Sequence, residues 1–250
     1  MRDCGRCPLR THGATDTLGN ALLDYASRTW CRPGRTNRHG AARTAGPKPG
    51  SRLAGSMVGM HAKRTAAPPV PVPRGATSSG DGIVVGAGPV DVDAYIDFLC
   101  PFCRQFELTA APVLDKLLVD RIISLARHPM NFLDAVSTAA YSTRAAAASA
   151  AASDAGMFHE YARTLFENQP PEGGPGLTDG QLVELGQEIG ITDPEFAETI
   201  RKGTYLPWPP FVTERATARG IAGTPSVFVR GIPVAARSGP ILAAVNRVLT

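Results

Sequence analysis

A strand pattern runs directly into a helix pattern in the stretch Val92-Asp-Ala-Tyr-Ile-Asp-Phe-Leu-Cys-Pro-Phe-Cys-Arg-Gln-Phe-Glu107. Apolar and polar residues alternate over its first half, which predicts a β-strand with one apolar face. Pro101 suits the first turn of the helix that follows, because its missing N–H would have no partner there in any case. Cys100 and Cys103 therefore lie at the junction between a strand and a helix.

The position of the two cysteines predicts redox chemistry. A helix N-terminus stabilises a thiolate, which is the reactive form of cysteine. We expect Cys100 to be an exposed, acidic thiol and Cys103, one turn further on, to lie close enough for a disulfide. The alternatives are half of a zinc site or two cysteines without a function. A zinc site needs a second pair of ligands, and the candidate pair Cys4 and Cys7 has no strand before it and no helix pattern after it.

Composition divides the 250 residues into two parts. Residues 1–75 hold 13 Lys/Arg and 3 Asp, whereas residues 76–250 hold 13 Lys/Arg and 19 Asp/Glu. The first part has few large apolar residues, which predicts a disordered basic extension over residues 1–81. The acidic folded part, residues 82–250, is not expected to bind nucleic acid. Apolar runs are too short for a transmembrane helix or a signal peptide, so the sequence as written predicts a cytoplasmic protein without a membrane segment.

The order of the elements predicts an α/β fold that is interrupted by helices. Short strands are expected at Ile83–Gly86 and Arg121–Arg127, and the pattern is helical from about residue 135 to residue 220. A hairpin at Ser226–Val234 and a helix at Ile241–Leu249 complete the chain. Two parts of one sheet thus enclose a helical insertion.

Four further side chains are expected to lie outside the chemistry. His128, followed by Pro129, should end a strand and have a structural role, and His159 should lie on the surface of an amphipathic helix. Both histidines could act in acid–base chemistry, but these positions are the simpler interpretation. Trp208 and Phe211 could flank a peptide groove, although core or packing positions are again simpler.

Gly223-Thr224-Pro225 directly precedes the hairpin. Proline is tolerated at the first residue of a strand. A cis Thr224–Pro225 bond would turn the backbone of Thr224 outward, where it could bind an extended substrate. An ordinary trans turn is the alternative, because only about 5–6% of X–Pro bonds in folded proteins are cis. The upstream Cys-x-x-Cys favours the cis form.

The combination of Cys100-Pro-Phe-Cys103 with Gly223-Thr-Pro225 resembles the DsbA-like branch of the thioredoxin superfamily. The other matching segments are Asp97–Glu107, Leu165–Pro170 and Gly220–Val229. The resemblance covers residues 82–250 and implies a thioredoxin-like α/β fold with an inserted all-helical subdomain at about 135–220.

The same resemblance implies a thiol:disulfide oxidoreductase that uses no metal or organic cofactor. Cys100 would be the attacking thiol and Cys103 the resolving thiol, with exchange through a mixed disulfide. Thr224 and a cis Pro225 would form the substrate-binding edge and keep metals off the thiols. Pro101 and Phe102 would also contact the substrate. The implied partners are protein or peptide thiols and disulfides and an unidentified redox partner, and such proteins often act outside the cytoplasm.

The sequence departs from the family pattern at two positions. The strongly oxidising archetype has histidine where this chain has Phe102, so we expect a less depressed Cys100 pKa and a weaker oxidant. Related enzymes place a buried acid six residues before the first cysteine as a proton carrier, and this chain has Ala94 there. Asp97 is the nearest substitute, and an edge or turn-facing carboxylate is the alternative.

Two other functions remain open. A non-redox enzyme on the same scaffold would resemble the glutathione-using isomerases of this branch. Those enzymes usually lack the second cysteine, so the presence of Cys103 argues against this function. The other alternative is a peptide-binding or chaperone module with incidental thiols, which would bind unfolded chains even without both cysteines.

Overall fold

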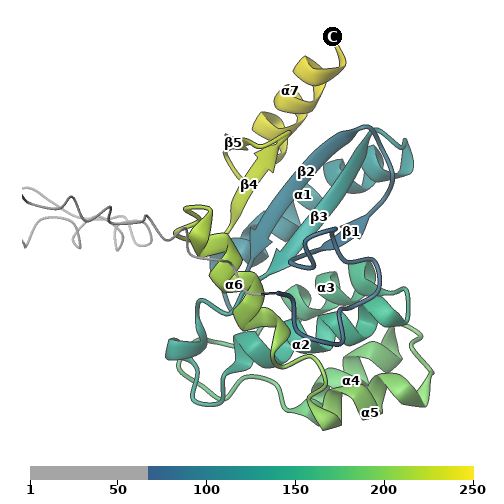
Figure 1. Ribbon diagram of the computed structural model, residues 1–250, viewed down its shortest axis with the longest axis vertical. Coiled ribbons are helices and arrows are strands. Elements are labelled where there is room, and N and C mark those ends of the chain that lie inside the picture. Colours follow the sequence, from purple (N-terminus) through teal and green to yellow (C-terminus); the bar gives the residue numbers. More distant parts are fainter. Residues whose placement is uncertain (1–66) are drawn as a thin grey trace, which may run out of the picture. The chain divides into compact units, whose positions relative to one another are not determined.

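The computed structural model describes residues 67–250 (Figure 1). The predicted disorder of residues 1–66 and the Cys4/Cys7 pair lie outside the described residues. In the described part, the strands are β1 (Ile83–Val85), β2 (Val90–Ile96), β3 (Ile123–Pro129), β4 (Ser226–Val229) and β5 (Ile232–Val234). The helices are α1 (Pro101–Val119), the 3-10 turn η1 (Asp134–Val136), α2 (Tyr141–Asp154), α3 (Phe158–Glu167), α4 (Asp179–Glu188), α5 (Pro194–Lys202), α6 (Trp208–Ala218) and α7 (Ser238–Leu249).

The strands form one mixed sheet in the order β1-β3-β2-β4-β5. β2 is parallel to β3, and the other neighbouring strands are antiparallel. The strand predicted before the cysteines is β2, and it lies at the centre of the sheet. β2 ends at Ile96 and α1 begins at Pro101. Cys100 therefore lies just beyond the carboxyl end of the central strand, directly before α1.

The end of β3 differs from the prediction. His128 and Pro129 were expected to end the strand, but they belong to it and pair with Tyr95 and Ile96 of β2. Proline is tolerated here because it is the last residue of the strand, where its missing N–H removes no bond from the middle of the ladder.

Two adjacent residues of β3 show which helices cover each face of the sheet. Successive side chains of a strand point to opposite faces. Arg127 hydrogen-bonds Glu107 of α1 at 2.9 Å and His159 of α3 at 2.7 Å. His128 instead contacts Asp81 on the other face, where α6 packs against β3. Thus α1 and α3 lie on one face and α6 on the other (Figure 1).

The helical insertion is built around α2, which contacts α3, α4, α5 and α6. Its alanines allow this close packing, and most of them are buried. The helix begins at Tyr141 and not near residue 135, because Ser137 and Asp134 accept the N–H groups of Tyr141 and Thr143. α4 begins with a capping box, in which the Thr178 hydroxyl accepts the N–H of Gln181. No helix within residues 67–250 has the length and apolar character needed to cross a membrane.

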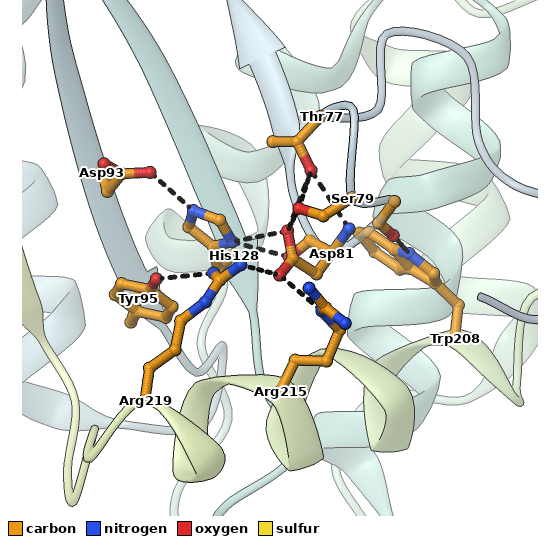
Figure 2. A network of polar contacts seen from close by, with 10 residues as sticks. Thr77, Ser79, Asp81, Asp93, Tyr95, His128, Trp208, Arg215 and Arg219 are labelled. Carbon is orange, nitrogen blue, oxygen red and sulfur yellow. Dashed lines mark hydrogen bonds and ion pairs between the residues drawn. The ribbon is translucent and has the colours of Figure 1, made fainter. Parts of the chain in front are cut away.

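The packed part of the chain begins before Gly82, where the sequence analysis placed the boundary. Residues 67–81, here called the N-terminal strap, pack against the domain through a buried carboxylate, Asp81. Asp81 forms ion pairs with Arg215 at 3.1 Å and Arg219 at 2.9 Å near the end of α6 (Figure 2). It also accepts hydrogen bonds from two strap hydroxyls, those of Thr77 and Ser79. The strap thus joins the sheet to α6.

His128 and Trp208 have packing roles beside the strap, as predicted. His128 Nδ1 lies 2.6 Å from the carbonyl oxygen of Asp81, and its Nε2 lies 3.0 Å from a carboxylate oxygen of Asp93 (Figure 2). The indole of Trp208 is fully buried, and its N–H donates to the Gly80 carbonyl at 2.7 Å. Both side chains are therefore held by the strap.

Candidate active site

The two cysteines lie at the start of α1, as predicted. Cys100 is the N-cap residue, and Pro101 occupies the first helical turn. Cys100 and Cys103 are not joined by a disulfide in this structure, and both are buried. The expectation that Cys100 is exposed was wrong, because only 4% of its surface is accessible. The backbone of Thr224 covers it, and the Cys100 thiol donates a hydrogen bond to the Thr224 carbonyl at 3.3 Å.

The thiols differ strongly in acidity. The pKa of Cys100 is lowered to about 6. The largest cause is a hydrogen bond from the Cys103 thiol, and burial, which would raise the pKa, opposes it. A hydrogen bond of the Thr224 side chain and those of the N–H groups of Phe102 and Cys103 lower the pKa of Cys100 further. Burial raises the pKa of Cys103 far above its usual range, and its hydrogen bond to Cys100 raises the pKa further. At neutral pH Cys100 therefore ionises while Cys103 keeps its proton, which is the asymmetry expected at a helix N-terminus.

Strand pairing brings Thr224 to the cysteines across 124 residues of sequence. Ser226 of β4 pairs with Tyr95 of β2 in an antiparallel register. The residues before Ser226 therefore run alongside the residues that follow β2. The Thr224–Pro225 bond is cis, and Pro225 directly precedes β4.

The helical insertion also contacts the active-site loop, which is the segment from residue 97 to residue 100. The side-chain amide of Gln169 donates to the carbonyls of Phe98 at 2.9 Å and Cys100 at 3.0 Å. Arg104 of α1 donates to the carbonyl of Phe166 at 2.9 Å. Sequence reasoning missed both residues, although both lie in segments that carry the family resemblance.

Replacing Gln169 with alanine is expected to lower the free energy of unfolding by about 1–3 kcal/mol, because two loop carbonyls lose their donor. We also expect slower disulfide exchange, since the loop that holds Cys100 is less restrained. Denaturant unfolding and an insulin-reduction assay would measure the two effects. Gln187→Ala, at an exposed position of α4, is the matched control. Equal effects of the two substitutions would contradict the role of Gln169.

Asp97 is a fully buried carboxylate and does not lie at an exposed edge. Its oxygens accept hydrogen bonds from the N–H of Leu99 at 2.8 Å, the N–H of Leu133 at 2.9 Å and the hydroxyl of Ser142 at 2.7 Å. Burial raises the pKa of Asp97 to about 6. The position expected to hold a buried acid, Ala94, is a buried alanine whose strand partner is Arg127.

The surface position expected for His159 was wrong. Its Nδ1 lies 2.7 Å from Arg127, and its Nε2 lies 2.9 Å from Asp115. Because arginine can only donate, Nδ1 accepts and the ring proton is on Nε2. Burial lowers the pKa of His159, followed by the charge of Arg127. The amphipathic pattern could not show that the polar side of α3 faces a buried arginine on β3.

A groove of about 540 Å³ lies beside Cys100. Its walls include three of the predicted substrate-binding residues, Phe102, Thr224 and Pro225. Phe106, Ala236 and Arg237 also line it. Phe102 is 69% exposed and is the most accessible aromatic side chain near the thiols. Pro101 is exposed at the start of α1 but does not line the groove.

The described residues do not form a metal site. Within residues 67–250, no three His, Cys, Asp or Glu side chains are grouped as metal ligands would be. A zinc site at the thiols would need a second pair of ligands. The pair considered in the sequence, Cys4 and Cys7, lies outside the described residues.

The family model described as Thioredoxin matches residues 78–240, and the chain therefore belongs to the thioredoxin family. Within that family it is DsbA-like. Reduced DsbA from Mycobacterium tuberculosis is 27% identical with a TM-score of 0.60, over 68% of this chain and 92% of that chain. Reduced DsbG, a disulfide bond oxidoreductase from the same organism, has the same identity and TM-score over 68% and 88%. MdbA from Actinomyces oris, at 21% identity and a TM-score of 0.59 over 70% and 92%, shares the fold.

Curated relatives contain a similar region within much longer proteins. The serine/threonine-protein kinase PknE of Mycobacterium tuberculosis is 34% identical over 135 residues, which is 50% of this chain and 24% of the kinase. The Na(+)/H(+) antiporter NhaA 3 of Salinispora tropica is 28% identical over 143 residues, which is 57% of this chain and 20% of the antiporter. The chain thus spans only about a quarter or less of each of these relatives.

Proposed function

We propose that this protein is a thiol:disulfide oxidoreductase that exchanges disulfides with protein or peptide substrates through Cys100 and Cys103. The observation that carries the proposal is the pair of thiols at the start of α1, of which Cys100 has the lowered pKa. The Thr224 carbonyl oxygen lies 3.3 Å from Cys100 Sγ. Membership of the thioredoxin family and 27% identity to DsbA and DsbG support it.

The two thiols divide the reaction into two exchanges. The Cys100 thiolate attacks a substrate disulfide, which forms a mixed disulfide and releases one substrate thiolate. Cys103 then loses its proton and attacks the Cys100 sulfur, which closes the Cys100–Cys103 disulfide and releases the second substrate thiolate. Substrate oxidation follows the same steps in reverse. Because Cys103 is fully buried, an outside thiol meets Cys100 first.

The groove beside Cys100 would hold the substrate chain. We assign Thr224 and Pro225 to the edge along which an extended peptide lies, with the apolar side chain of Phe102 against it. We also assign Pro101 to the substrate-facing surface, because it is exposed at the start of α1 next to Cys100, outside the groove. An extended peptide binds such an edge through its backbone and leaves its side chains to the groove.

The proposal is tested by the reduction potential of the Cys100/Cys103 pair, titrated against glutathione or dithiothreitol. We expect one two-electron transition between about −270 mV, typical of thioredoxin, and about −120 mV, typical of DsbA. Alkylation followed by mass spectrometry of the tryptic peptide Gly75–Arg104 reports this pair separately from the other three cysteines. The absence of a titratable disulfide would overturn the proposal.

A peptide-binding module is the second candidate, and the open groove with an exposed Phe102 is the observation that favours it. The doubly substituted variant Cys100→Ser/Cys103→Ser separates the two functions. The binding module would be the better description under two conditions. The variant would have to bind an unfolded chain as well as the wild type does, and the wild type would have to show no disulfide exchange.

A further inference from the structure

Of the described residues that line the groove beside Cys100, Arg237 alone has an ionisable side chain. The others are apolar or have an uncharged polar side chain. The β4–β5 hairpin explains the position of Arg237, because its antiparallel pairing places the residues after Val234 beside those before Val227. Another wall of the groove is Thr224, whose carbonyl oxygen lies 3.3 Å from Cys100 Sγ. The positive charge and the redox site therefore share one groove.

No carboxylate neutralises the Arg237 side chain in the part of the chain that the structure describes. The residue is exposed, and none of the ion pairs among residues 67–250 includes it. Residues 76–250 hold 13 Lys/Arg and 19 Asp/Glu, so this part of the chain is acidic as a whole. The groove thus carries a positive charge on a domain of negative net charge. An acidic ligand would be attracted to this groove and repelled by much of the remaining surface.

Arg237 is also an unusual residue for its place at the start of α7. It is the N-cap residue and forms no side-chain hydrogen bond to the helix. Ser, Thr, Asp and Asn are preferred at this place, because their side-chain oxygens accept a free N–H of the first turn. A guanidinium group can only donate, and its charge has the same sign as the partial charge of a helix N-terminus. The stability of α7 therefore does not explain this arginine, and departures of this kind are expected at functional sites.

We propose that Arg237 is a specificity-determining residue that favours protein substrates with an acidic side chain close to the reacting cysteine. The inference rests on the function proposed above and names a substrate class for the same groove. A peptide whose cysteine reaches Cys100 would lie along Thr224, so its neighbouring side chains would enter the groove that Arg237 lines. The acidic side chain should lie within about three residues of the cysteine, which is about 10 Å of extended chain. The planar guanidinium can bind its carboxylate through two parallel hydrogen bonds.

The test uses short peptides whose single cysteine is joined by a disulfide to 2-mercaptoethanol. Their ends are acetylated and amidated, so that a glutamate or a glutamine at one position near the cysteine makes the only difference in charge. The reduced full chain is mixed with each peptide, and chromatography follows the loss of the peptide disulfide. The rate of Cys100→Ser is subtracted, which removes exchange at the other cysteines. Each rate is then divided by the rate of the same peptide with dithiothreitol, because a nearby carboxylate also changes intrinsic reactivity.

The wild type should react faster with the glutamate peptide than with the glutamine peptide at one or more positions, by about threefold to fivefold, which is the size of an exposed ion pair. Arg237→Gln should abolish this preference, and Arg237→Glu should reverse it, because two carboxylates repel each other. The matched control is Arg247→Gln, which removes the charge of another exposed arginine of α7, outside the groove. A merely structural role of Arg237 would slow both peptides alike and leave their ratio unchanged.

A preference that is lost in Arg237→Gln, reversed in Arg237→Glu and kept in Arg247→Gln supports the inference. Equal rates for the two peptides at every position in the wild type overturn it, as does a preference that survives in Arg237→Gln or disappears in Arg247→Gln. If the wild type exchanged no peptide disulfide at all, the proposed function would fail instead. Binding of the same peptides with serine in place of cysteine, measured by fluorescence anisotropy, would then still compare glutamate with glutamine in the groove.

Discussion

Replacing Cys100 with serine is expected to reduce disulfide exchange to the uncatalysed background. Cys100 has the acidic thiol of the pair, and a hydroxyl group cannot form the mixed disulfide on which both exchanges depend. Insulin reduction in the presence of dithiothreitol and oxidation of a reduced model peptide measure the two directions. Since both directions need the same sulfur, we expect both to be lost together.

Cys31→Ser is the matched control for this experiment, because it removes a thiol elsewhere in the chain. It should keep the wild-type rate. Activity retained in Cys100→Ser, or lost equally in Cys31→Ser, would show that the exchange does not depend on the start of α1.

Replacing Cys103 with serine should have a different and equally large effect. The variant keeps the attacking thiol but lacks the thiol that resolves the mixed disulfide. Without Cys103 the active site has no second thiol that can attack the Cys100 sulfur intramolecularly, so the covalent complex should accumulate until an added thiol resolves it. Non-reducing electrophoresis and intact mass spectrometry would show the protein joined to its substrate, and dithiothreitol should release it.

The Cys100→Ser/Cys103→Ser variant should form no such complex, which makes it the control for trapping. A complex that survives dithiothreitol, or one that forms equally well without Cys100, would contradict the assignment of the two thiols. The trapped complexes would also identify the substrates, because each contains the protein that Cys100 attacked.

The central part of the fold could be predicted because its signals are local. The alternation before Cys100, the proline after it and the hairpin after Pro225 each depend on a few neighbouring residues. The same is true of the capping box at Thr178 and of the alanine-rich pattern of α2. The helical insertion also followed from a local pattern, over about residues 135–220. The meeting of Thr224 with Cys100 followed only from the family resemblance, and the register of β2 with β4 gives its physical reason.

The features that could not be predicted depend on contacts between distant residues. The burial of Asp97 requires Leu133 and Ser142, which lie 36 and 45 residues further along the chain. The position of His159 depends on Arg127 of a different element. Cys100 is covered because the Thr224 loop closes over it, which no local pattern at the helix start can indicate.

The N-terminal strap determines where this domain can be separated from neighbouring sequence. A chain that begins at Gly82 would keep every strand and helix of Figure 1 and yet lack Asp81. Arg215 and Arg219 would then lack the carboxylate with which both form ion pairs. These two arginines lie near the end of α6, which precedes Thr224 in the chain. A fusion junction, an affinity tag or a protease site therefore belongs upstream of residue 67.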